Sequence, residues 1–491
     1  MTPRPARSAV PDWAILVIAC VAQFMVILDV SIVNVALPSI GRELHYSPTG
    51  LQWVVNAYVL VFAGFLLLGG RAADLYGRRK VYLFGIALFA AASLVGGFAQ
   101  SSSWLTVARA FQGLGGAVLS PATLTILVTS FSGPRLVRAL GLWSAIAGAG
   151  AAAGVTLGGI LTSELSWRWV LFVNVPIAAL AMVFALSFLT ELRRTDEHRR
   201  LDVAGALTAT GGLALLVYAI VDTDVHPWTA PTTIVLLLCA AAVLAVFVLI
   251  ERRTAAPLVP FRLFRSRFVS GANVVMFLVG GAFFSMWYFL SLFVQNVLGY
   301  SALRTGFAFL PMAVTMIVGS QVSSRLTVRL GQRPLMFAGT LCAAAGYLWL
   351  SRIHAGADYL TAVALPAVLV SLGIALLFTP LASAATTDVA QSEAGLASGV
   401  LNTSRQVGGS LGLAVLATIA TDRTQVVLHH SHRALAEALA AGYSRAFVIA
   451  AGLCVAGFVL AAMVPGRRRA RRAEPVPAED QHALLLSVPE G

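Results

Sequence analysis

The sequence is poor in charged residues, which make up 11% of its 491 residues, whereas hydrophobic residues make up 58%. A water-soluble domain usually carries about one quarter charged residues, so this composition excludes an ordinary soluble protein. Apolar stretches long enough to cross a bilayer, about 20 residues each, follow one another along almost the whole chain. Lipid is therefore predicted to be the solvent of most of the chain.

Residues for metal, disulfide and phosphate chemistry are also scarce. The four cysteines lie far apart within apolar stretches, and none of the eight histidines falls inside one. The only lysine, Lys80, lies in a basic turn without a glycine-rich phosphate loop. Clustered carboxylates, which a lipid-linked transferase needs to hold a metal-bound pyrophosphate, are absent at the predicted membrane boundaries. We therefore expect no catalytic residues, no metal, no cofactor and no ATP hydrolysis.

Positive charge is concentrated in the short connections between apolar stretches. The formal net charge of +13 could by itself indicate nucleic-acid binding. Most of the 34 Lys and Arg residues, however, lie in connections on the same side as the two chain ends. By the positive-inside rule that side is the cytoplasm. We expect a multi-pass protein of the cell membrane with both termini cytoplasmic and no nucleic-acid partner.

Fourteen apolar stretches are predicted to be membrane-spanning helices. They cover residues 13–38, 51–70, 81–99, 104–130, 141–161, 170–190, 203–221, 231–250, 268–295, 306–323, 334–353, 360–385, 396–421 and 444–464. Between the last two, residues 424–443 are predicted to form an amphipathic helix at the outer surface or a loop. The predicted fold class is an all-α integral membrane protein with fourteen transmembrane helices.

Two similar turns indicate an internal duplication. The sequence GRRK at 77–80, after the second span, is echoed by GQRP at 331–334, after the tenth. Two pseudo-symmetric six-helix bundles with two inserted central helices would produce this echo. The predicted parts are a cytoplasmic leader (1–12), a first bundle (13–190), two linking helices with flanking cytoplasmic loops (191–267), a second bundle (268–465) and a disordered cytoplasmic tail (466–491).

One carboxylate, that of Asp29, lies well inside an apolar span. An ionisable side chain there costs about 3 kcal/mol or more unless it faces a cavity or a partner. Arg109 in the fourth span is the expected partner, because at about 1.5 Å rise per residue the two residues lie at a similar depth. Such a pair can load and release a proton when its surroundings change. We predict proton coupling by Asp29 and Arg109, the alternative being a static ion pair that only packs helices.

The turn at 70–80 carries Gly70, Asp74, Gly77 and Arg78 at a spacing more specific than a basic turn alone. Gly77 permits a tight reversal of the chain, and Asp74 can lie against the N-terminus of a neighbouring helix. We predict that these four residues serve a conformational switch.

Two further helical faces carry distinctive residues. In the fifth span, small residues let a neighbouring helix approach closely, as static packing or as a sliding interface. They are Gly150, Gly154, Gly158 and Gly159. An aromatic and polar face of the ninth span, with an arginine of the thirteenth, is predicted to line a cavity, unless the rings pack in the core or face lipid. These residues are Phe284, Tyr288, Ser291, Gln295 and Arg405.

Taken together, these motifs resemble the fourteen-helix drug:proton antiporter family of the major facilitator superfamily, over nearly the whole chain. Asp29 falls where that family has its first-helix acidic motif, and the turn at 70–80 matches the superfamily's turn signature. Arg109 with Gln112 and Gly113 is similar to the fourth-helix motif implicated in proton coupling.

The fifth span departs from the family pattern, because Val155 follows Gly154 where the antiporter motif has a proline. The resemblance nevertheless implies proton-coupled efflux of lipophilic drugs, antibiotics or secondary metabolites across the cytoplasmic membrane. It implies a small lipophilic substrate, protons and the lipid bilayer as partners, and a functional monomer. The alternative is a proton-coupled importer or facilitator of a small solute; an enzyme is not expected.

Overall fold

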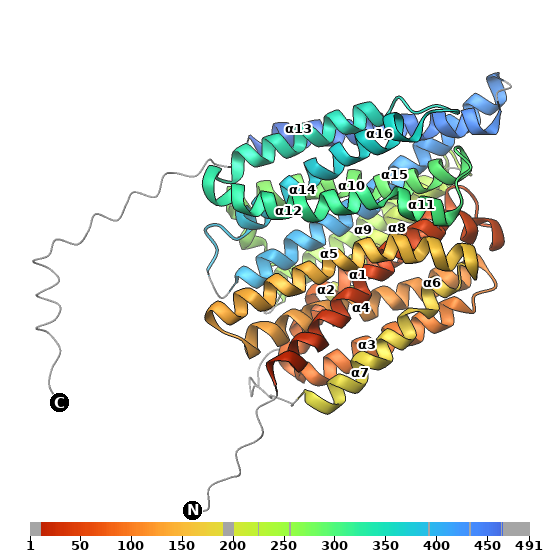
Figure 1. Ribbon diagram of the computed structural model, residues 1–491. Helices are drawn as coiled ribbons and strands as arrows, with labels where there is room; N and C mark the ends of the chain where they lie inside the picture. Colours follow the sequence, from red (N-terminus) through yellow and green to blue (C-terminus); the bar gives the residue numbers. More distant parts are fainter. Residues whose placement is uncertain are drawn as a thin grey trace, which may run out of the picture.

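The computed structural model describes residues 11–189, 201–223, 225–254, 257–390, 393–431, 434–462 and 464. Within these ranges the chain forms helices and no strand. The long helices lie side by side as one bundle (Figure 1). We call the end of the bundle where α1 begins and α16 ends the terminal end, and the other the opposite end.

The first six predicted spans correspond to helices of the described chain. They are α1 (Asp12–Glu43), α2 (Trp53–Tyr76), α3 (Arg78–Gly97), α4 (Ser102–Ser130), α5 (Gly133–Glu164) and the consecutive pair α6 (Trp169–Phe172) and α7 (Asn174–Phe188). The two linking helices are α8 (Val203–Asp222) and α9 (Pro231–Arg253).

The last six predicted spans also correspond to helices. They are α10 (Arg267–Asn296), α11 (Ala302–Ala308) with α12 (Leu310–Leu330), α13 (Gln332–Leu350), α14 (Leu365–Ala385), α15 (Ala394–Ser431) and α16 (Leu435–Ala461). A π-helical turn, Leu360–Ala364, leads into α14. Short 3-10 helices, Gly50–Gln52 and Phe261–Arg265, precede α2 and α10.

The predicted fold class is confirmed. In the described part of the chain, thirteen helical segments are long and apolar enough to cross a membrane. The one predicted span outside this set, 334–353, corresponds to α13, whose first turn is polar because it carries Gln332 and Arg333. This helix packs against α14 and α16 in the same way as α3 packs against α4 and α7.

The prediction for residues 424–443 is wrong, because no separate surface helix or long loop lies there. Helix α15 continues to Ser431, beyond its predicted end at 421, and α16 already begins at Leu435, before its predicted start at 444. The helical spacing of apolar residues in this stretch belongs to the ends of these two long helices.

The two sets of six helices repeat the same packing. Helix α1 packs on α5 as α10 packs on α15, and α2 packs on α4 as α12 packs on α14. The turns after α2 and α12 each contain a glycine in the left-handed region, Gly77 with φ 91° and Gly331 with φ 86°. A shared backbone conformation at these two turns accounts for their sequence echo.

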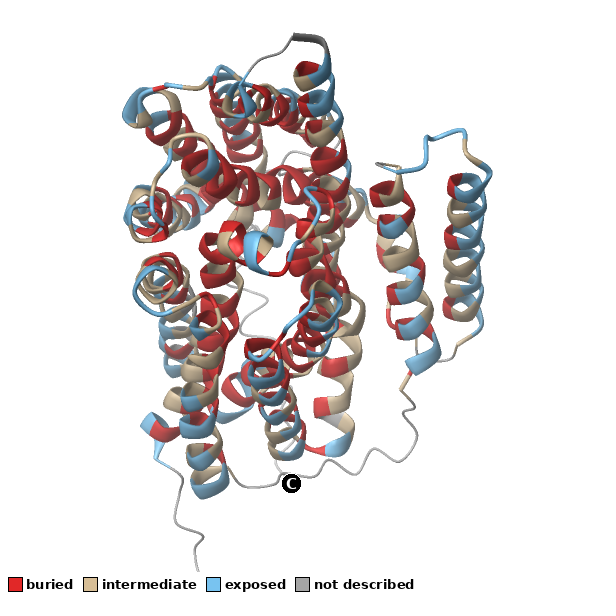
Figure 2. Ribbon diagram, turned by 90° about the vertical axis from the view of Figure 1, so that its right-hand side faces the viewer, coloured by how far each residue is buried: buried red, intermediate tan, exposed pale blue. Residues whose placement is uncertain are grey.

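The linking helices lie beside the rest of the bundle. Helix α8 packs on α2 and α15, whereas α9 packs mainly on α8 and leaves most of its surface exposed. Figure 2 shows a pair of helices set to one side, the outer one largely exposed. The linking helices therefore add to the periphery and leave the space between the two halves to the other twelve spans.

Candidate functional site

Asp29 of α1 and Arg109 of α4 form an ion pair inside the bundle. Arg109 Nη1 donates to Asp29 Oδ2 at 2.6 Å, and the two side chains are 3% and 0% exposed. The structure therefore brings together the two residues that the sequence analysis paired by depth. A buried ion pair needs further hydrogen bonds to offset the loss of hydration.

The second carboxylate oxygen accepts two hydrogen bonds from side-chain amides. Gln112 Nε2 donates to Asp29 Oδ1 at 2.7 Å, and Asn174 Nδ2 donates to the same oxygen at 3.0 Å. Each of these nitrogens also lies 3.0 Å from Ser93 Oγ, and Ser93 in turn donates to the carbonyl oxygen of Leu171 at 2.9 Å. All the polar side chains of this network are buried.

Arg109 is held on its other sides by α2 and by its own helix. Its Nε donates to the carbonyl oxygen of Val54 at 3.0 Å, and Nη1 also donates to Gln112 Oε1 at 2.7 Å. The guanidinium carbon lies 4.5 Å from the centre of the Tyr58 ring, a cation–π arrangement. Five helices of the first half (α1, α2, α3, α4 and α7) thus supply the surroundings of one carboxylate.

A proton on Asp29 would change the bonds within this network. Within the described part of the chain, Asp29 Oδ2 is bonded to Arg109 alone, so a proton on that oxygen would remove the anion that holds the guanidinium. Arg109 would keep its bonds to Val54 and Gln112 and its place over Tyr58. Protonation of Asp29 would therefore weaken the link between α1 and α4.

Ser93, Asn174 and Tyr58 belong to the network although the sequence analysis did not assign them to it. Val173 separates α6 from α7, and Asn174 is the first residue of α7. Two sequence signals could have found Asn174: it is a polar residue within an apolar span, and Asn174-Val175-Pro176 is similar to a stretch of the antiporter family. Ser93 has no sequence feature that distinguishes it from other serines in spans.

Part of the predicted cavity face of α10 joins the two halves at the opposite end. Ser291 Oγ donates to the carbonyl oxygen of Asn34 at 2.6 Å, and Gln295 Nε2 donates to that of Val35 at 2.9 Å. Tyr288, on the same face, is buried. In this conformation these polar groups bind the backbone of α1.

The predicted glycine face of α5 contacts two different helices. A Cβ atom added to Gly154 would lie 2.6 Å from Ser31 Cβ of α1. Gly150 and Gly158 also approach α1 closely, at Phe24 and Ile32. A Cβ on Gly159 would instead lie 2.7 Å from the carbonyl oxygen of Ala302, at the start of α11.

Helices α5 and α11 also meet at Val155, the position where the sequence departs from the family motif. A Cβ on Gly306 would lie 2.4 Å from the carbonyl oxygen of Val155. Nearby, the backbone N–H of Leu303 donates to Ser163 Oγ at 2.9 Å. The backbones of the two halves are therefore in direct contact at the opposite end.

The turn at the terminal end of α2 is tied to neighbouring helices. Gly77 separates α2 from α3, and Arg78 donates a hydrogen bond to Thr129 Oγ1 of α4. Gly70 lies against Pro121 of α4. The side chain of Asp74 lies outside what the structure describes.

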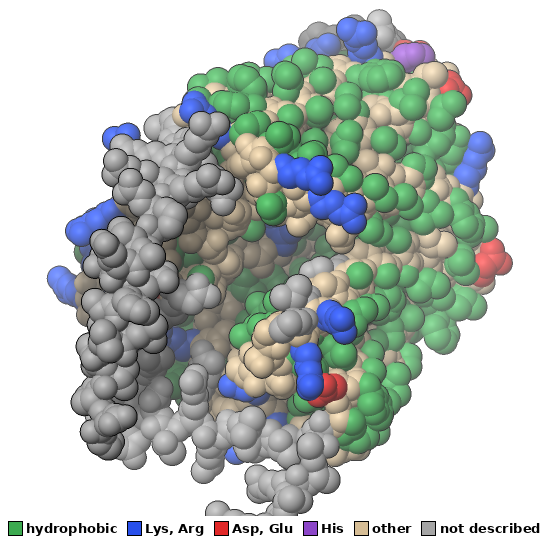
Figure 3. Space-filling view, turned by 60° about the vertical axis from the view of Figure 1, so that its left-hand side comes forward, with side chains coloured by type: hydrophobic (Ala, Val, Ile, Leu, Met, Phe, Trp, Pro, Cys, Tyr) green, Lys and Arg blue, Asp and Glu red, His purple; other side chains and the backbone are tan. Residues whose placement is uncertain are grey.

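Between the two halves the terminal end is open. Figure 3 shows that this face is hollowed, with Lys and Arg side chains beside the hollow. Phe284 and Arg405, the remaining predicted cavity residues, are half-buried. Arg405 Nη2 donates to Asn402 Oδ1 at 2.7 Å.

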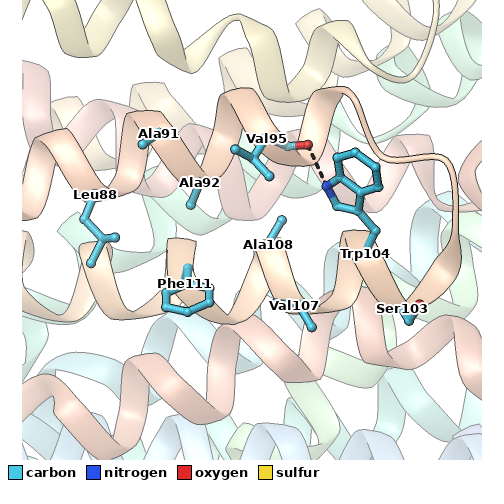
Figure 4. Close-up of a pocket in the computed structure, with 9 residues that line it drawn as sticks. All are labelled: Leu88, Ala91, Ala92, Val95, Ser103, Trp104, Val107, Ala108 and Phe111. Atoms are coloured by element: carbon cyan, nitrogen blue, oxygen red, sulfur yellow. Dashed lines mark hydrogen bonds between the residues drawn. The ribbon is translucent and has the colours of Figure 1, made fainter.

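A second concavity lies on the outside of the first half, between α3 and α4. It has a volume of about 530 Å³, and its lining includes Val95, Trp104, Val107 and Phe111 (Figure 4). Trp104 Nε1 donates to the carbonyl oxygen of Val95 at 3.1 Å. Because these large side chains are exposed on membrane-spanning helices, this groove faces lipid and is separate from the space between the halves.

Comparison with known proteins gives consistent matches. The Major Facilitator Superfamily matches residues 19–413. The cephamycin export protein CmcT of Amycolatopsis lactamdurans is 44% identical over 95% of both chains. The puromycin resistance protein pur8 of Streptomyces alboniger is 40% identical over 93% of both. A solved bacterial homologue of the human lysosomal transporter Spinster, in an inward-facing conformation, has a TM-score of 0.65 at 16% identity, covering 94% of this chain and 98% of its own.

Proposed function

Because the chain belongs to the major facilitator superfamily, we propose that it exports small lipophilic compounds from the cytoplasm in exchange for protons. The relatives at 44% and 40% identity are named for cephamycin export and puromycin resistance, so antibiotics are the substrate class we infer. The chain would act as a monomer in the cell membrane, since one polypeptide supplies both halves.

The buried surroundings of Asp29 are the observation that carries proton coupling. A carboxylate inside a membrane span is costly unless it has a function or a partner. Among the described residues, Arg109 alone bonds to one of the two carboxylate oxygens, which is an arrangement that a single proton can break. Uphill export needs such a group, because each proton that enters down a 100 mV potential supplies about 2.3 kcal/mol.

The arrangement of the halves supports alternating access. We infer two six-helix bundles, 13–190 and 268–465, on either side of the linking region 191–267. Their contacts close the opposite end at Ser291 and Gln295, while the terminal end is hollowed. With cytoplasmic termini, the present conformation would be open to the cytoplasm and able to take up a substrate there.

An accumulation assay tests the proposed function. Expression in a bacterium that lacks its own efflux pumps should lower cellular accumulation of lipophilic antibiotics such as puromycin, and a protonophore should restore it. A control strain would express an inactive variant at the same level. Raised accumulation on expression would instead identify an importer or facilitator, and lowered accumulation that resists the protonophore would exclude proton coupling.

We expect the terminal end to face the cytoplasm. In a variant without native cysteines, a cysteine at Val225, exposed between α8 and α9, should react with a membrane-impermeant maleimide in intact cells. A cysteine at Ser132, exposed between α4 and α5, should react only after permeabilisation. The reverse pattern would overturn the orientation that the positive-inside rule predicts.

The switch residues should affect turnover more than binding. We expect Asp74→Asn to lower the maximal transport rate while substrate affinity stays close to that of the unchanged protein, because α2 and α3 meet at the terminal end, away from Asp29. Val328→Asn, at the corresponding turn of the second half, is the matched control and should transport normally. A large loss of affinity with an unchanged maximal rate, measured over a range of substrate concentrations, would contradict this role.

A further inference from the structure

Arg405 is a charged side chain inside a span that lacks an acidic partner. None of the ion pairs formed by the described residues includes it. One hydrogen bond reaches Asn402 on the same helix, and the guanidinium Nε has no partner. Arg109 of α4, by contrast, has a carboxylate, a carbonyl and an amide around it.

The position of Arg405 makes the missing anion costly. Its backbone carbonyl lies against Gly280, in the middle of α10, where a Cβ would come within 2.4 Å of it. An uncompensated cation at such a depth is expensive and usually marks a path or a ligand site. Arg405 is half-buried, so part of the side chain remains accessible to a ligand.

Aromatic rings from α10 and α14 lie next to the guanidinium. Its central carbon is 5.5 Å from the centre of the Phe378 ring. Phe378 meets Phe283 edge to face at 6.0 Å, and Phe283 meets Phe284 at 5.8 Å and Trp287 at 6.5 Å. All four rings are half-buried. We call Arg405 and these four rings the arginine–aromatic site.

Helix geometry directs this site toward the space between the halves. Phe284 lies seven residues, or two turns, before Ser291 and therefore on the same face of α10. Ser291 faces the first half, because it bonds to the backbone of α1. Phe284 thus lies on the same side of α10, nearer the terminal end, where the molecule is hollowed, and its ring borders Gly409 of α15.

We propose that the arginine–aromatic site binds organic anions with a flat aromatic body, the charged group on Arg405 and the rings against the aromatic wall. Guanidinium groups bind carboxylate and sulfonate oxygens in paired hydrogen bonds, and aromatic rings stack well on aromatic side chains. This inference rests on the proposed function, since it names the substrate class of the same transport path. It assigns the charge selectivity of that path to the second half and its proton coupling to the first.

Two fluorescent probes that differ by one charged group test the proposal. 8-Anilino-1-naphthalenesulfonate (ANS) has an aromatic sulfonate, whereas N-phenyl-1-naphthylamine (NPN) has the same ring system without it. Binding is measured with the purified full chain in detergent, with the signal of empty micelles subtracted. No pH gradient is present, so failure of proton-coupled export would not alter the result.

We expect Arg405→Gln to weaken ANS binding by about tenfold or more, the usual loss of a hydrogen bond to a charged group. NPN binding should stay unchanged, which also shows that the variant is folded. Arg405→Lys keeps the charge but cannot form the paired hydrogen bonds, so it should lose less ANS affinity than Arg405→Gln. Arg304→Gln is the matched control, because Arg304 is exposed at the opposite end and also lies over a ring, that of Tyr300, at 3.6 Å; it should change neither affinity.

Three results would overturn the proposal. The first is no saturable ANS binding by the unchanged protein. The second is ANS binding that Arg405→Gln leaves intact, or an equal loss of ANS and NPN binding. The third is displacement of ANS by short-chain phosphatidylglycerol but not by naphthalene-2-sulfonate, which would assign the site to a lipid headgroup.

Discussion

Replacing Asp29 with asparagine should abolish export driven by a pH gradient. Asp29 is the only carboxylate well inside an apolar span, so no other side chain at that depth can exchange a proton near neutral pH without a very large change in its proton affinity. Asparagine has nearly the same size and keeps hydrogen-bonding atoms in place. A residue that only packed helices would therefore tolerate the change with reduced but measurable active transport.

The measurement is export from proteoliposomes under an imposed pH gradient, together with proton release on substrate addition. We expect both to fall to the level of protein-free liposomes, while substrate binding persists. Because Asp29→Asn leaves Arg109 without its carboxylate, which can destabilise a buried site by about 3–5 kcal/mol, the double variant Asp29→Asn with Arg109→Gln is prepared as well. It removes the unpaired charge and should fold, yet remain uncoupled.

Asp202→Asn is the matched control for this prediction. Asp202 is also a buried carboxylate, but it lies at the start of α8 and accepts a hydrogen bond from the backbone N–H of Gly205 at 2.7 Å. Asp202 is the N-cap residue of α8, and asparagine caps a helix as well as aspartate does. This variant should therefore transport normally. Proton-driven export by folded Asp29→Asn, or its loss in Asp202→Asn alone, would refute the assignment of Asp29.

The pairing of Asp29 with Arg109 could be predicted from the sequence because it depends on depth alone. Hydropathy locates the ends of the spans, and the constant rise of a helix converts residue number into depth. The partners on Asp29 Oδ1 could not be found in this way. Whether Asn174 and Ser93 turn toward Asp29 depends on how five helices are rotated against one another, which is decided by side-chain packing over the whole first half.

Periodicity likewise predicted which residues share a face but not what that face contacts. Ser291 and Gln295 lie on one side of α10 with Phe284, as their spacing indicates. The structure divides that face, because the first two bond to α1 and the ring of the third lies against Gly409 of α15. The ends of α15 and α16 were misjudged for a different reason: hydropathy limits the membrane part of a helix and gives no information on how far it continues into water.

A bulkier residue at Gly306 should prevent closure of the opposite end. Gly306 of α11 is buried against α5, and even a Cβ atom there would lie 2.4 Å from the carbonyl oxygen of Val155. Backbone atoms cannot yield as a side chain does, so Gly306→Val must push α11 away from α5. Since α5 belongs to the first half and α11 to the second, the displacement separates the halves where they are now joined.

This penalty affects only the conformation in which α5 and α11 touch. Overpacking usually costs about 1–3 kcal/mol, which would lower the population of that conformation by roughly five- to 150-fold. A transporter that rarely closes at the opposite end rarely opens toward the cytoplasm to take up substrate. We therefore expect the maximal export rate of Gly306→Val to fall by about tenfold or more, and that of Gly306→Ala by less.

Cysteine accessibility distinguishes this mechanism from misfolding. Ser291 is buried and bonded to the backbone of α1, so a cysteine at this position should be protected from a membrane-impermeant maleimide in the otherwise unchanged protein. In the Gly306→Val variant it should react from the opposite end. Gly452→Val is the matched control, because nothing lies within 4 Å of a Cβ at Gly452 of α16, and it should leave both transport and protection unchanged. Normal export by Gly306→Val, with the cysteine at 291 still protected, would show that the contact between α5 and α11 does not hold the opposite end closed.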